Sequence, residues 1–189
     1  MKKIIFLSLI LSACQYLEHP FDHPIKETYN GYTIKKGKNH SSYRQVWPFK
    51  GHGMKFDFRF LGSVIHTPKD SSVHKLYGFS DNTHHSKNSI RLGWRMRQDS
   101  TIDLCTYIRI DGDLQPQRWI ANINVEEEHT AQLRITDNSY IVIVDEKRVE
   151  IPGRTKKWLW GFKYRLYPYF EDGQGNGTPH DMTFYIYEY

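Results

Sequence analysis

The sequence has only two cysteines in 189 residues and no long run of apolar side chains. No apolar stretch reaches the roughly 18 residues of a membrane-spanning helix. With 39% hydrophobic residues, the chain has too much apolar surface to be wholly disordered. Its length suits one domain with one core. We therefore expect a soluble globular protein of one main domain.

The charge is also low. The formal net charge is +5, and it falls to +3 without Lys2 and Lys3, which lie in a segment that we expect to be removed. Nucleic-acid binding usually relies on a dense basic patch, and this excess is too small to predict one. We therefore predict no nucleic-acid partner.

The first residues look like a targeting segment. Lys2 and Lys3 precede a short apolar run at residues 4–11, and Leu11-Ser12-Ala13-Cys14 follows. This order resembles the bacterial lipoprotein signal, in which the cysteine is cleaved and acylated. The resemblance implies removal of residues 1–13, lipidation at Cys14 with palmitate-type chains, and anchoring in the bacterial cell envelope, with the outer membrane favoured. The alternative is an apolar N-terminal helix that stays attached.

If Cys14 carries lipid, Cys105 is the remaining thiol and no intramolecular disulfide can form. Residues 14–48 are polar and contain His-Pro pairs and a basic run, so their first part is typical of a tether. An equally good interpretation is an N-terminal arm with a first strand near residues 31–34. The folded domain is expected to span residues 49–189.

From residue 54 onward, apolar and polar side chains alternate with a period of two. Met54, Phe56, Phe58 and Phe60 alternate with charged residues, which is typical of a half-buried strand. The same pattern and intervening turns predict further strands at 90–97, 102–110, 116–124, 130–136, 139–145, 147–151, 162–170 and 181–188. We expect the last two strands to pair with each other. No stretch of 12 residues carries a helical stripe, so the predicted fold class is all-β, an antiparallel sandwich or barrel.

Three segments extend this prediction. Residues 76–94, 164–170 and 178–186 resemble a group of uncharacterised Bacteroidetes-type secreted proteins, which in turn resemble concanavalin A-like jelly rolls. That fold is shared by lectin-like modules, glycan hydrolases and polysaccharide lyases. The resemblance covers roughly residues 50–189 and implies two curved antiparallel sheets with a glycan-sized groove on the concave one. A fold of this kind hosts many functions, so it does not define the chemistry.

The polar faces of the strands are rich in arginine and tyrosine. Guanidinium groups can bind carboxylate or sulfate with two hydrogen bonds, and tyrosine rings offer flat apolar faces that suit sugars. The alternative is that these side chains form a solvated outer face. The candidates on the central strands are Arg91, Arg95, Asp103, Tyr107 and Arg109, and those near the C-terminus are Lys163, Arg165, Tyr167, Tyr169, Tyr185 and Tyr187.

A histidine-rich loop at residues 81–89 is the densest group of candidate functional residues. His84, His85 and Asn88 lie in it, and His180 lies at another strand entrance. Imidazoles can serve as metal ligands, as general bases or as hydrogen-bond partners of a ligand. The spacing of His84 and His85 does not favour one metal, and a purely structural loop remains an alternative. Oxygen ligands around residues 171–181 would suit calcium, but we predict no metal and no cofactor.

These observations favour a lipid-anchored envelope protein that binds a glycan, with acidic glycans preferred, through His84, His85, Asn88, Arg91, Tyr107, Arg165, Tyr167, Tyr169 and His180. A lyase-type enzyme with a His or Tyr base is the first alternative, and a structural or adhesion subunit bound to another envelope protein is the second. The Glu-x-Asp-x-x-Glu pattern of glycosidases on this fold is absent, as are Gln-Ile-His and Tyr-x-Lys-x-Gly-x-Tyr-x-Gln, which occur in lyases. We therefore assign no catalytic residue, and the oligomeric state stays open.

Overall fold

The computed structural model describes residues 29–41, 48, 51–68, 71–154, 162–171 and 173–189. The predicted lipidation site, Cys14, and the predicted signal at residues 1–13 lie outside these ranges. Among the described residues, no helix is long and apolar enough to cross a membrane. The helical structure that is described is one short 3₁₀ turn, η1 (Gly62–Val64).

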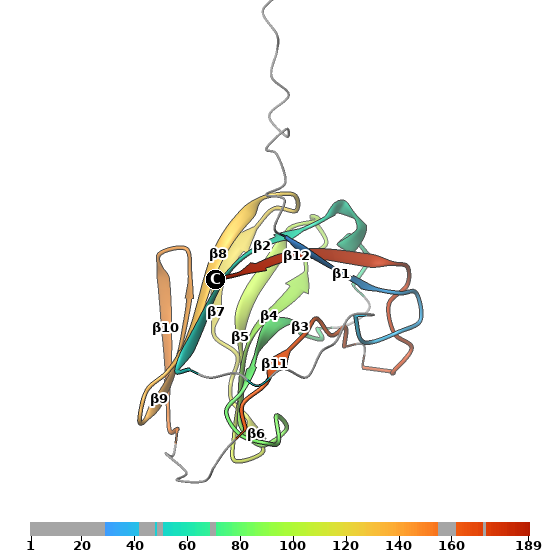
Figure 1. Cartoon of the computed structure of the whole chain (residues 1–189). Coiled ribbons are helices and arrows are strands. Elements are labelled where there is room, and N and C mark those ends of the chain that lie inside the picture. Colours follow the sequence, from blue (N-terminus) through green and yellow to red (C-terminus); the bar gives the residue numbers. More distant parts are fainter. Residues whose placement is uncertain (1–28, 42–47, 49–50, 69–70, 155–161, 172) are drawn as a thin grey trace, which may run out of the picture.

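Two antiparallel sheets lie face to face (Figure 1). Sheet A has the strand order β1-β12-β2-β8-β9-β10, and sheet B has the order β11-β3-β4-β5-β6, with β7 also paired to β5. The strands of sheet A are β1 (Asn30–Ile34), β2 (Gly53–Phe60), β8 (Glu128–Ile135), β9 (Ser139–Val144), β10 (Lys147–Pro152) and β12 (Met182–Glu188). Those of sheet B are β3 (His74–Ser80), β4 (Ser89–Met96), β5 (Ile102–Ile110), β6 (Asp113–Leu114), β7 (Trp119–Ile123) and β11 (Arg165–Leu166).

The core lies between the two sheets and is built by the alternation seen in the sequence. Phe56, Phe58 and Phe60 of β2 are fully buried on the inner face of sheet A. Trp94 of β4 meets them from sheet B, with its ring centroid 5.2 Å from that of Phe60. Apolar residues at every second position therefore give each sheet an inner face, and the prediction of an all-β antiparallel sandwich is confirmed.

The predicted strands agree with the structure in most places. β1 also forms, pairing with β12, as the alternative of a first strand near residues 31–34 anticipated. Two points were wrong. The strand predicted at 162–170 is reduced to β11, which pairs with β3 in sheet B, whereas β12 lies in sheet A, so the two do not pair with each other. β3 itself was not predicted as a strand, because a bulge between Lys75 and Tyr77 breaks its alternation.

Candidate functional site

The residues that form the candidate site lie on the outer face of sheet B. Ile90 and Leu92 of β4 are buried in the core, so Arg91 between them points to the opposite face. The strand register places Arg91 beside Gly78 on β3 and Tyr107 on β5. Gly78 has no room for a side chain, since an added Cβ would lie 2.9 Å from Cγ of Arg91. The backbone of β3 at Gly78 therefore packs directly against the first carbon atoms of the Arg91 side chain.

A groove of about 720 Å³ runs over this face. The segment around β11 and the loop between β3 and β4 line its edges. Among the described residues that line the groove, none is acidic, and the full set is His40, Lys75, His85, Ser86, Ser89, Arg91, Tyr107, Arg109, Tyr164, Arg165, Leu166, Tyr167 and Tyr169. The lining therefore combines four cationic side chains with four tyrosines.

Arg91 is a cationic side chain of the groove whose charge has little compensation among the described residues. Its Nε atom is buried and has no hydrogen-bond partner among the described residues. Its Nη2 atom donates to the carbonyl oxygen of Tyr167 at 3.4 Å, and no described carboxylate forms an ion pair with it. Burial lowers the pKa of Arg91 to about 10. A guanidinium group that is desolvated and lacks an anion is suited to bind one from outside.

Lys75 lies beside Arg91 on the same face but is already engaged. Its ammonium group lies 4.7 Å from the ring centroid of Tyr107 and 4.3 Å from that of Tyr169. It also forms an ion pair with Glu171. Lys75 therefore holds the tyrosine rings in place by cation–π contacts while its charge is largely balanced.

Arg165 is engaged as well. Its Nε and Nη2 atoms donate to the two carboxylate oxygens of Glu188 at 2.7 Å each. Tyr77 donates its hydroxyl hydrogen to the same carboxylate at 2.8 Å. Because Arg165 and Tyr77 belong to sheet B and Glu188 to sheet A, this cluster joins the two sheets. Arg165 has a structural role here, besides lining the groove.

At one edge of the groove, His85 contacts Tyr164. The Nδ1 atom of His85 and the hydroxyl oxygen of Tyr164 are 2.7 Å apart. Burial lowers the pKa of His85, and the positive charges of Arg91 and Lys75 lower it further. The imidazole is therefore neutral at pH 7, so the pair can pass a proton between its nitrogen, its hydroxyl group and a bound ligand.

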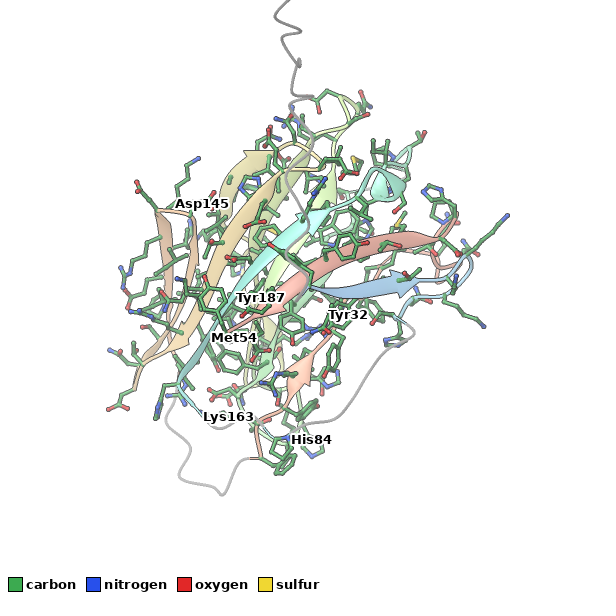
Figure 2. All side chains as sticks on the ribbon, turned by 45° about the horizontal axis from the view of Figure 1, so that its top comes forward. Tyr32, Met54, His84, Asp145, Lys163 and Tyr187 are labelled. Carbon is green, nitrogen blue, oxygen red and sulfur yellow. The ribbon has the colours of Figure 1, made fainter. Side chains whose placement is uncertain are left out.

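The structure brings six of the nine predicted ligand residues into this groove: His85, Arg91, Tyr107, Arg165, Tyr167 and Tyr169. It does not place the other three there. His84 lies at the tip of its loop (Figure 2), where its backbone N–H donates to Asn82. Asn88 is buried and accepts the backbone N–H of Asp111, which makes it a turn residue. The Nε2 atom of His180 donates a hydrogen bond to the carbonyl oxygen of Ser63, and His180 lines a different cavity.

The predicted arginine- and tyrosine-rich face is also divided between the sheets. Tyr185 and Tyr187 of β12 lie on the outer face of sheet A, since the alternating residues Phe184 and Ile186 are buried in the core. Figure 2 labels Tyr187. Their expected place beside Arg91 was wrong, because it assumed that β12 pairs with the segment around β11.

Several residues of the groove were not selected by sequence reasoning, among them Lys75, His40 and Tyr164. Lys75 lies on the strand that was not predicted, and His40 lies in the arm before β2. Tyr164 stands in a segment rich in aromatic residues, and its contact with His85, 79 positions away, leaves no local signal. The arm brings His40 against the ring of Tyr169, at a centroid distance of 4.6 Å.

Metal binding has no geometric support in the described part of the chain, where no group of three or more His, Cys, Asp or Glu side chains could hold an ion. Two of the oxygen ligands considered for calcium form ion pairs instead. Asp181 pairs with Lys35 at 2.7 Å, and Glu171 pairs with Lys75. Burial raises the pKa of the free Cys105 thiol to about 12, so it stays protonated and packs against Val73 and Tyr107.

No protein-family model matches the chain, and comparison with curated proteins finds no match either. Solved structures do resemble it. Alginate lyase Aly36B is 14% identical with a TM-score of 0.59, over 87% of this chain and 80% of that one. Alginate lyase A1-II', of polysaccharide lyase family 7, is 12% identical with a TM-score of 0.56, over 86% and 78% of the two chains. The Crh5 transglycosylase is 11% identical with a TM-score of 0.53, over 87% and 78%. At these identities the likeness establishes the fold, a concanavalin A-like jelly roll.

Proposed function

We propose that this protein binds an acidic polysaccharide in the groove of sheet B. The observation that carries the proposal is Arg91, a part-buried arginine whose buried Nε atom has no described partner. Keeping a charge desolvated and unpaired costs stability, so a bound anion would recover energy that the folded chain does not recover itself. A uronate carboxylate matches the planar donor geometry of arginine.

The surroundings of Arg91 suit a sugar polymer better than a small free anion. Tyr107, Tyr167 and Tyr169 line the groove with ring surfaces and hydroxyl groups, which is the combination that sugar rings bind. The volume of about 720 Å³ exceeds what one carboxylate needs. The solved structures with this fold include alginate lyases, and alginate is a polymer of uronates.

The test is binding of the purified protein to neutral, uronate and sulfated polysaccharides, with Arg91→Met as the variant. Loss of the charged hydrogen bonds should cost about 1.5–3 kcal/mol, which weakens uronate binding roughly 10-fold to 150-fold. Arg134→Met is the matched control, because Arg134 is exposed on the outer face of sheet A. It should bind as the wild type does.

Equal binding by Arg91→Met and the wild type would remove the basis of the proposal. Failure of every polysaccharide to bind would also contradict it, and would favour the structural or adhesion role with a protein partner.

A second candidate function, cleavage of the polymer by β-elimination, is favoured by the contact of His85 with Tyr164. In this reaction a base removes the proton α to the uronate carboxylate, the bond from C4 to the glycosidic oxygen breaks, and a C4–C5 double bond forms. The leaving oxygen takes up a proton. The neutral imidazole and the phenol could act as base and acid, while Arg91 neutralises the carboxylate.

Elimination is detected by the ultraviolet absorbance of the unsaturated product. If the reaction occurs, Tyr164→Phe should lower its rate by about 10²-fold or more and leave binding intact, because the hydroxyl group contacts His85 and no core residue. An absence of absorbance with every uronate polymer that binds would restrict the function to binding.

We also propose that the groove is presented at a membrane surface, through lipid at Cys14. The sequence Leu11-Ser12-Ala13-Cys14 after a short apolar run supports this placement. Metabolic labelling with a fatty acid in a bacterial host tests it: Cys14→Ala should lose the label and leave the membrane fraction. A label that survives this substitution would contradict it.

A further inference from the structure

A second cavity, of about 380 Å³, opens beside the groove. It lies between the segment that leads into β3 and the residues that follow β11. The two sites share a wall, because Glu171 lines the cavity, Lys75 lines the groove, and the two side chains form an ion pair. A polymer that leaves the groove past Lys75 would therefore meet this cavity next.

The charges around the cavity are balanced, unlike that of Arg91 in the groove. Arg95 lines it but donates to Asp103 at 3.1 Å, and its guanidinium group stacks 4.4 Å from the ring centroid of Trp119. Glu171 is neutralised by Lys75. An ion entering the cavity would have to displace one of these pairs, so an uncharged ligand is favoured.

Three histidines, His66, His74 and His180, contribute to the polar part of the lining. His66 donates its Nδ1 hydrogen to the carbonyl oxygen of Val64 at 2.9 Å, which leaves Nε2 as an acceptor. Burial lowers the pKa of His66, so the ring is neutral at pH 7. His74 accepts the backbone N–H of Glu171 through Nδ1 at 3.1 Å, which places its own hydrogen on Nε2. The lining thus offers an acceptor of defined position for a hydroxyl group.

Apolar side chains form another part of the lining. Phe170 stacks on His74, with ring centroids 4.0 Å apart and planes 14° from parallel. Phe170 and Met96 are both buried, while Pro179 is exposed. A volume of about 380 Å³ is within the range of small-molecule sites and suits one ring better than a long chain.

We infer that this cavity binds an uncharged, hydroxyl-bearing ring, namely a neutral sugar residue. The ligand would then be a mixed glycan, with a uronate against Arg91 and a neutral sugar against His66. The inference that a uronate binds Arg91 rests on the proposed function of the groove. The inference that a neutral sugar binds near His66 rests on the cavity alone.

The test uses the purified full chain and NMR titration with glucose, galactose, mannose and N-acetylglucosamine, and separately with glucuronic acid. Two variants address the cavity. His66→Ala removes the acceptor, and Thr67→Trp fills the opening from an exposed position outside the core. Arg91→Met addresses the groove.

We expect at least one neutral sugar to bind the wild type, at least 5-fold more weakly to His66→Ala, and undetectably to Thr67→Trp. Arg91→Met should bind that sugar normally and lose glucuronic acid. A disaccharide of a uronate linked to that neutral sugar should bind more tightly than either part, because the second contact becomes intramolecular.

Two results would overturn the inference without touching the groove proposal. One is that no neutral sugar shifts any resonance of the wild type while glucuronic acid does. The other is that neutral sugars bind Thr67→Trp and His66→Ala as well as they bind the wild type. Failure of glucuronic acid to bind the wild type, while a neutral sugar does bind it, would instead contradict the groove proposal.

Discussion

Replacement of Arg91 by methionine should make the protein more stable while it weakens glycan binding. Burial lowers the pKa of Arg91 from 12.5 to about 10. At 1.36 kcal/mol per unit, the charged side chain costs the folded state about 3 kcal/mol as an upper bound. This cost is fully present below pH 10, because the folded protein holds the charge there against its burial.

Methionine matches the arginine side chain as far as the Nε position and removes the charge, so we expect the free energy of unfolding to rise by about 1–3 kcal/mol. The assay is denaturant unfolding at pH 7, with the slope checked for an unchanged transition. Arg165→Met is the contrasting control. Arg165 is held by Glu188, so the same substitution should lower the free energy of unfolding by roughly 1–3 kcal/mol.

A lower stability of Arg91→Met would refute the reasoning, since it would mean that the guanidinium group is compensated within the folded chain. If Arg91→Met is more stable but binds uronate as the wild type does, the burial of the charge costs stability as argued. Arg91 would then have no role in binding at the groove.

Three further predictions test other parts of the structure. If the protein catalyses elimination, the acid limb of its pH–rate profile should have its midpoint below pH 6.5, since burial lowers the pKa of His85, and a midpoint above that value would exclude His85 as the base. Gly78→Ala should lower the free energy of unfolding by about 3 kcal/mol, because the added Cβ meets the carbonyl oxygen of Ile90; an unchanged denaturation midpoint would contradict the strand packing. Phe58→Ala should cost about 3–5 kcal/mol in the same assay, as a fully buried ring is lost, and a loss below 1 kcal/mol would argue against its place in the core.

The fold could be predicted because its signal is local. Residues 54–60 show how: a strand with one buried face must alternate, and Phe56, Phe58 and Phe60 do so without any knowledge of their partners. The prediction was weakest where this signal is interrupted. β3 carries a bulge, and residues 162–170 alternate over a longer stretch than the two residues that enter sheet B.

The candidate site could be predicted in part. Arg91 and Tyr107 follow from alternation alone, because polar residues between buried ones must lie on the outer face. His85 was selected as a reactive side chain on a turn-rich loop. Tyr185 and Tyr187 were placed wrongly, since the same alternation cannot say to which sheet a strand belongs.

The sequence by itself determined the fold class, the strands with clear alternation and the residue types that could bind an acidic sugar, because side-chain period and chemistry are carried by neighbouring residues. Only the tertiary structure decided which of those residues share a face. It paired Arg165 with Glu188, left Arg91 without a described anionic partner and brought Tyr164 to His85. These contacts join positions distant in the chain, and their geometry depends on strand order and register, which no local pattern encodes.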